Sequence, residues 1–103
     1  MAGNTTWRPR STHGKLSEAK IRELPDSAFA FPTQRLAPLT DAGYVREAIA
    51  QFAAIENVSD DDRDLAFENI RRAAVHYHVA LVETNWRQLG TRPPRPTYSR
   101  NAR

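Results

Sequence analysis

The sequence contains no cysteine, which excludes disulfide bonds and thiolate metal sites. Its four glycines are scattered, so there is no glycine-rich phosphate loop, and no Gly-x-Ser-x-Gly motif marks a nucleophilic serine. No apolar run approaches the roughly 20 residues of a membrane span, and the polar residues 1–14 lack the apolar stretch of a signal peptide. These absences lead us to expect a non-catalytic intracellular protein that uses no cofactor and does not contact membranes.

Acidic residues are missing from residues 84–103, which contain five arginines. Basic side chains also gather near the N-terminus, whereas the acids gather in the middle of the chain. The formal net charge of +3 therefore combines two basic ends with an acidic body. The predicted organisation is a basic N-terminal arm at residues 1–15, a helical domain at 16–90 and a basic, Pro/Arg-rich C-terminal arm at 91–103.

Basic ends suit a protein that binds something anionic, either nucleic acid or the acidic face of a neighbouring protein. Arginine neutralises phosphates, and an aromatic ring beside it can stack on an exposed base. Two other interpretations stay open: the ends are solubilising tails, or Arg92–Pro96 is a proline-rich ligand for an aromatic groove. The predicted partner- or nucleic-acid-binding residues are Trp7, Arg8, Arg10, Arg92, Arg95, Tyr98, Arg100 and Arg103.

Two segments show the apolar periodicity of helices, Thr40–Glu56 and Ser59–His78. Thr40 or Asp41 is predicted to cap the first helix, and Ser59 the second, where the aspartate three residues later completes a capping box. The connection between the helices is so short that it predicts an antiparallel helical hairpin.

The N-terminal part is predicted to combine an arm with a short helix. Residues 1–15 are polar and are predicted to be disordered or extended. A helix is predicted within Lys15–Leu24, because Ser17 is a good N-terminal cap and Pro25 stops the helix.

The remaining apolar stretches are predicted to cover the hairpin. In residues 26–39 an extended backbone points Phe29 and Phe31 to one face, and the prolines rule out a central strand. We therefore predict an extended clip laid over the helices. Val79–Val82 is predicted either to pair with this clip as a short strand or to be a buried connector, before a last turn capped by Thr84. The expected core comprises Phe29, Phe31, Val45, Ile49, Phe52, Ile70, Ala74, Tyr77, Val79, Leu81 and Trp86.

Metal binding and catalysis have little support in the sequence. His76 and His78 are two positions apart and point in different directions on a helix, and no third ligand is evident. The run of aspartates after Ser59 lacks the spacing and central glycine of a calcium loop, and a helix N-terminus accounts for it. The sequence therefore predicts neither a metal site nor an active site.

Much of the chain carries a recognisable pattern. Its residues are Leu24–Pro32, Arg35, Leu39–Ala42, Val45, Arg46, Phe52, Val58–Asp60, Arg63, Asp64, Ala66, Ile70, Ala73, Ala74, Trp86, Arg87, Leu89 and Gly90. This pattern resembles an uncharacterised domain family of actinobacterial and phage proteins, whose members are small free-standing proteins or are appended to phage head-maturation proteins. Two positions depart from it: His78 replaces a usual glycine, and Tyr44 replaces a common histidine.

The resemblance implies no activity, because the family has none assigned. Our leading hypothesis is a structural or interaction module of phage-like ancestry that acts through its arms within a larger, capsid- or head-associated assembly. The alternative is a nucleic-acid-binding accessory protein that contacts phosphates through its terminal arginines. The expected partner is a protein or a neighbouring subunit, including a second copy of this chain. The expected location is the cytoplasm, or the virion if the protein is phage-encoded.

Overall fold

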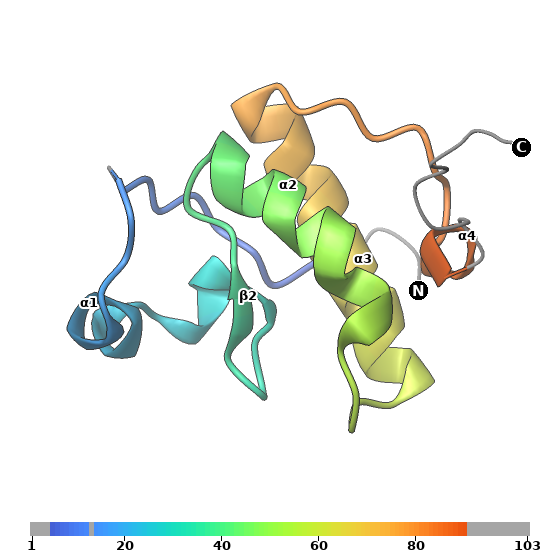
Figure 1. Ribbon diagram of the computed structural model, residues 1–103, viewed down its shortest axis with the longest axis horizontal. Coiled ribbons are helices and arrows are strands. Elements are labelled where there is room, and N and C mark those ends of the chain that lie inside the picture. The colour runs from blue at the N-terminus through green and yellow to red at the C-terminus, as the bar shows by residue number, and fades with distance from the viewer. Residues whose placement is uncertain (1–4, 13, 91–103) are drawn as a thin grey trace, which may run out of the picture.

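The computed structural model describes residues 5–12 and 14–90. In chain order its elements are α1 (Glu18–Glu23), the 3-10 turn η1 (Asp26–Ala28), β1 (Phe29–Phe31), β2 (Leu36–Pro38), α2 (Ala42–Gln51), the 3-10 turn η2 (Phe52–Ala54), α3 (Asp60–Tyr77) and α4 (Trp86–Gly90). Figure 1 shows the α2–α3 hairpin in the middle, with α1 and α4 toward opposite ends of the long axis. The predicted class, a mostly helical domain with a helical hairpin and one short β pairing, is confirmed.

Local capping signals set where the two long helices begin. The Asp41 carboxylate accepts a hydrogen bond from the backbone N–H of Tyr44 at 2.8 Å and caps α2. At α3 the Ser59 hydroxyl accepts from the Asp62 N–H at 3.0 Å, and the Asp62 carboxylate accepts from the Ser59 N–H at 3.1 Å. This reciprocal pair is the predicted capping box. Helix α2 is shorter than predicted, because the chain tightens into a 3-10 turn at Phe52.

Helix α3 ends at a residue with left-handed backbone. His78 has φ +61°, and its N–H reaches back to the carbonyls of Ala74 and Val75. A side chain is strained in this conformation and glycine is not, so a glycine would fit this position without strain. Asn57, between the two long helices, is also left-handed, at φ +66°.

The sheet consists of β1 and β2, paired antiparallel with Phe29 opposite Pro38 and Phe31 opposite Leu36. The prediction that Val79–Val82 pairs with β1 as a strand is therefore wrong, and the alternative, a buried connector, holds only for Val79 and Leu81, which pack partly buried against the core. This run is not a strand, and its side chains alternate between half-buried and exposed, with Val82 84% exposed. β1 pairs with β2 because only a short turn separates the two strands in the sequence. Closing so short a loop costs little chain entropy.

The buried side chains form two clusters. The larger one lies between α2, α3 and β1 and includes Phe31, Phe52 and Ile70. The smaller one holds α1 against the start of β1 and includes Phe29. The two phenylalanines of the clip are thus both core residues, each 1% exposed, but they belong to different clusters. Of the expected core, Ile49, Tyr77, Val79, Leu81 and Trp86 are only partly buried.

Arg35 fixes the end of α1 to the β1–β2 turn. One guanidinium nitrogen, Nη2, donates to the carbonyl of Leu24 at 2.9 Å and to the carbonyl of Ile21 at 3.0 Å, which also accepts from the Leu24 N–H. The other, Nη1, contacts Asp26 at 2.6 Å, and the guanidinium lies 4.7 Å from the centre of the Phe29 ring. This arginine, one of the residues that carry the family resemblance, thus has a structural role.

Residues 5–12 are part of the folded body. They are extended, which was one of the two predicted alternatives, but they do not form a separate arm. The Arg8 N–H donates to the Ser27 carbonyl at 3.0 Å, the Thr12 N–H donates to the Thr40 carbonyl at 3.2 Å, and Trp7 is 3% exposed. The physical reason is the indole, which adds a large apolar surface to the core and outweighs the polar composition around it.

Candidate functional site

A buried amide attaches the N-terminal segment to α3. The Asn69 side chain is fully buried, and its Oδ1 accepts hydrogen bonds from the backbone N–H groups of Thr6 at 3.0 Å and Trp7 at 3.1 Å. Its Nδ2 donates to the Ala30 carbonyl in β1 at 2.9 Å and to the Thr6 hydroxyl at 3.2 Å. One side chain therefore joins three parts of the chain that are distant in sequence.

Trp7 is fixed by this attachment and by its own contacts. Its Nε1–H donates to the Leu39 carbonyl at 3.1 Å. Its ring packs edge-on against His76 and Tyr77, with centroid distances of 5.6 and 6.0 Å. The backbone on either side of Trp7 is consequently held along the outside of α3.

The space between this segment and α3 is an open groove of about 520 Å³. One wall is made by Thr5, Trp7 and Pro9. The other is a single face of α3, whose residues recur at helical spacing (i, i+3, i+4, i+7, i+8). The residues of this face are Glu68, Arg71, Arg72, Val75 and His76.

The groove combines positive charge with apolar surface. Arg71 forms an ion pair with Glu68 at 3.7 Å through one of its guanidinium nitrogens. Arg72 has no ion pair with any residue in the described ranges. Val75 is 79% exposed, so its aliphatic side chain is accessible in the groove. Chemically, this arrangement can bind a carboxylate beside an aliphatic side chain. We call this surface, Thr5 to Pro9 with the α3 face, the α3 groove.

The residues predicted to bind a partner fall into three groups. Arg8 and Arg10 are exposed and make no ion pair within residues 5–12 and 14–90, so their guanidinium groups are available. Trp7 is a correction: it is buried in the core, so its indole face is not available to stack on a base. The others, Arg92, Arg95, Tyr98, Arg100 and Arg103, lie outside the described residues.

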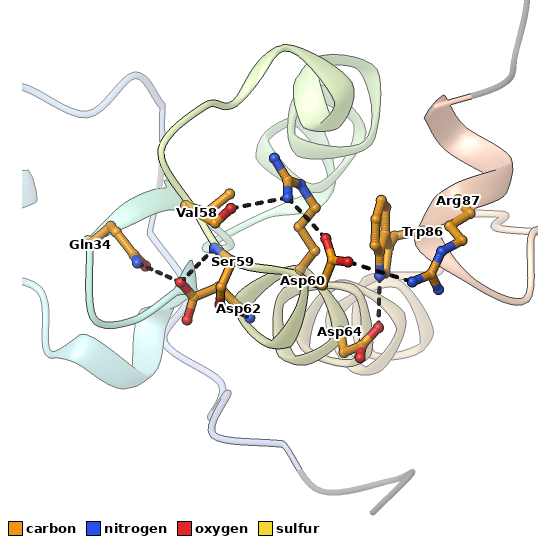
Figure 2. Close-up of polar contacts among 9 residues, drawn as sticks. Gln34, Val58, Ser59, Asp60, Asp62, Asp64, Trp86 and Arg87 are labelled. Carbon is orange, nitrogen blue, oxygen red and sulfur yellow. Dashed lines mark hydrogen bonds and ion pairs between the residues drawn. The ribbon is translucent and has the colours of Figure 1, made fainter.

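A second polar cluster lies at the start of α3 (Figure 2). Asp64 accepts a 2.7 Å hydrogen bond from the Trp86 indole, and Asp60 lies 3.8 Å from the Arg87 guanidinium. Arg63 donates to the Val58 carbonyl at 3.0 Å. The contacts of Asp64 with Trp86 and of Asp60 with Arg87 join α4 to α3, so the acidic run has a structural role here. α4 itself is capped by Asn85, not by Thr84 as predicted, because the Asn85 side-chain oxygen Oδ1 accepts from the Arg87 N–H at 2.9 Å.

Asp62 is the acid of this cluster whose ionisation is coupled to folding. The hydrogen bond from the Ser59 backbone N–H lowers the pKa of Asp62 below its ordinary value, and side-chain hydrogen bonds from Gln34 and Ser59 act in the same direction against the cost of desolvation. Figure 2 shows Gln34 and Ser59 directed toward this carboxylate. The charged Asp62 carboxylate therefore stabilises the folded protein fully at pH values above the pKa that Asp62 has in the unfolded chain. This stabilisation is lost as the pH falls through the lower pKa that Asp62 has in the folded protein.

We expect Asp62→Asn to destabilise the protein at pH 7, and the difference from the parent protein to shrink as the pH falls below about 4, where the parent carboxyl also becomes neutral. Urea unfolding at a series of pH values measures this. The matched control is Asp61→Asn, which removes the same charge from the same helical turn but from an exposed side chain that makes no ion pair with the described residues. Equal pH profiles for the two variants would contradict the assignment.

No cluster of three or more histidine, cysteine or carboxylate side chains suited to a metal ion occurs in the part of the chain that the structure describes. Likewise, none of the helices within the described ranges has the length and apolar character to cross a membrane.

Sequence reasoning missed the α3 groove. The sequence pattern alone predicts no binding role for Arg71, Arg72 or Val75. A usable signal was present: Val75 lies off the buried stripe of α3 and shares a helical face with both arginines. The opposite wall of the groove had no such signal, because an extended segment has no periodicity that shows where it packs.

The fold and the groove define a small, mostly helical domain with a β-hairpin and a partly basic surface groove. The chain belongs to DUF6582, a family of unknown function, which matches residues 12–84. Neither the comparison with curated proteins nor the comparison with solved structures gives a match. The family range contains all of α3, including Asn69, but not the segment that forms the other wall of the groove.

Proposed function

We propose that this protein is a non-catalytic interaction module of phage-like ancestry that acts within a larger assembly, of the capsid- or head-associated type, and binds an acidic protein surface through its basic residues. The observation that carries the proposal is the placement of Arg8 and Arg10. Both are exposed and free of ion pairs with described residues, on a segment whose backbone is fixed by Asn69 and Trp7. Fixed backbone lowers the entropy cost of binding.

The burial of Trp7 favours a protein partner over single-stranded nucleic acid. Binding of single strands relies on stacking of bases on aromatic rings, and this ring is occupied by the core. The arginines can still contact phosphates, so a nucleic-acid-binding protein is the competing outcome of the test. The two differ in salt dependence, because each phosphate contact releases counterions and makes binding to duplex DNA fall steeply with salt.

The test measures binding of the full chain to two labelled probes, a poly-glutamate peptide and a short DNA duplex, by fluorescence anisotropy at 50 and 200 mM salt. We expect the peptide to bind and Arg8→Glu/Arg10→Glu to weaken it about fivefold or more, since exposed charge pairs contribute up to about 1 kcal/mol each. The control, Lys15→Glu/Lys20→Glu, makes the same charge change at exposed positions elsewhere. Tight DNA binding that is lost at 200 mM salt, without peptide binding, would overturn the proposal.

A further inference from the structure

We infer that the α3 groove binds an extended acidic peptide that carries an apolar side chain between its carboxylates. The inference rests on the proposed function, because it names the chemistry of the partner segment and a second place where that segment is held. It concerns different residues from Arg8 and Arg10, so the two can be tested separately.

Charge complementarity selects an acidic occupant. The α3 face of the groove carries Arg71, Arg72 and His76 but only one carboxylate, Glu68, and that carboxylate is already paired with Arg71 at 3.7 Å. Arg72 therefore presents a guanidinium without a counter-charge among the described residues. A planar guanidinium binds a carboxylate through two parallel hydrogen bonds, which gives the bound peptide a defined position.

The apolar part of the groove favours a peptide that carries an aliphatic side chain between its carboxylates. Val75 lies three residues after Arg72, so the two side chains are neighbours on the helix surface. Val75 is 79% exposed, and Trp7 and Pro9 face it from the opposite wall. An aliphatic side chain placed here would be removed from water on two sides.

The dimensions suit an extended segment. From Glu68 to His76 the helix rises roughly 12 Å at 1.5 Å per residue. An extended peptide advances about 3.3 Å per residue, so about four residues would span this length. The segment opposite, residues 5–9, is itself extended and is held to α3 through Asn69, so the groove is formed before a ligand arrives.

The first experiment compares two twelve-residue peptides in anisotropy titrations. One contains Asp and Glu with Leu at every third position, and the other has Ser in place of each Leu. We expect the leucine peptide to bind at least fivefold more tightly, and Arg72→Glu and Val75→Ser each to reduce that binding at least threefold. The matched controls are Arg46→Glu, an exposed arginine of α2, and Val82→Ser, an exposed valine outside the groove.

A second readout locates the bound peptide. In ¹⁵N NMR spectra the indole signal of Trp7 and the amides of Val75 and His76 should shift on titration with the leucine peptide. The indole signal of Trp86, at the other end of α3, serves as the internal reference and should shift much less. Because all the substituted side chains are exposed, the variants are expected to fold, and the same spectra verify this.

The outcomes separate the two proposals. Loss of peptide binding in Arg8→Glu/Arg10→Glu without any effect of Arg72→Glu or Val75→Ser would overturn the groove and leave the proposed function standing. Loss only in the groove variants would support the groove and overturn the assignment of the N-terminal arginines. Peptide-independent dimers in light scattering that Arg72→Glu dissociates would show that a second copy occupies the groove, and would overturn the peptide proposal.

Discussion

Replacing Asn69 with alanine is expected to lower the free energy of unfolding by about 3–5 kcal/mol, because it leaves buried backbone groups without partners at roughly 1–3 kcal/mol each. These groups are the carbonyl of Ala30 and the partly buried N–H of Thr6, whereas the N–H of Trp7 keeps its 3.1 Å hydrogen bond to the Thr5 hydroxyl. A domain of this size has a total stability on the order of 5–10 kcal/mol. The loss is therefore about a third or more of the total stability and is readily measured.

Urea unfolding followed by circular dichroism measures the effect at Asn69, and two further variants make it specific. Asn69→Asp keeps an oxygen for the two N–H groups but removes the N–H donor to the Ala30 carbonyl. We therefore expect this variant to lower the free energy of unfolding at neutral pH and to recover part of that loss in acid, where the protonated carboxyl can donate a hydrogen bond. Gln51→Ala truncates an exposed amide on α2 and should change stability by less than about 0.5 kcal/mol. A midpoint for Asn69→Ala close to that of Gln51→Ala would show that the amide is not the attachment described here.

The parts of the fold that the sequence predicts correctly are those set by local chemistry. The capping box of Ser59 and Asp62 and the cap at Ser17 each involve residues three positions apart. The residues that form the hydrogen bonds are therefore visible within one short stretch of sequence. The stop at Pro25 is likewise a property of the proline ring and the residue before it. Such signals position α1, α2 and α3 but do not determine which surfaces meet.

The features that the sequence does not predict depend on contacts between distant residues. Trp7 and Asn69 are 62 positions apart, and neither an indole in a polar segment nor an asparagine beside Ile70 shows locally that it will be buried. The pairing of β1 with β2 was missed for a different reason: Arg35 and Ala37 adopt positive φ, at +56° and +62°, which these residue types rarely do.

In the candidate site, too, some features follow from local sequence and others from contacts between distant residues. Arg8 and Arg10 were predicted from composition and are exposed, whereas Trp7, predicted from its position beside them, is buried. The α3 face of the groove is a helical repeat and is readable from residue spacing. The groove exists only because the N-terminal segment is placed opposite that face, which requires the tertiary contacts of Asn69 and Trp7.

Trp7→Ala is the second large effect that we expect, a loss of about 3–5 kcal/mol from a cavity in the core. The indole contributes packing in the main cluster, edge contacts with His76 and Tyr77, and a hydrogen bond to the Leu39 carbonyl. If residues 1–15 were a free arm, the same substitution would leave the unfolding midpoint unchanged. Thermal and urea unfolding of the full chain therefore separate the two descriptions directly.

Trp7→Phe separates packing from the hydrogen bond. It keeps an aromatic ring in the core but leaves the buried Leu39 carbonyl without the indole donor, so a loss of about 1–2 kcal/mol is expected. Trp86→Ala is the control for truncating a tryptophan: its side chain is only partly buried, and we expect a smaller loss than for Trp7→Ala.

A double-mutant cycle between Trp7→Ala and Asn69→Ala tests whether the two residues act as one attachment. Asn69 holds the backbone N–H of Trp7, and burial of the indole is what brings that N–H to the amide, so each change weakens the contact made by the other residue. The double variant should therefore lose less stability than the sum of the single losses, by at least about 1 kcal/mol. Additive losses would mean that the backbone near Trp7 stays on α3 without its side chain. In that case the wall of the α3 groove would be held by other contacts of residues 5–12, such as those of Arg8 with Ser27 and Thr12 with Thr40.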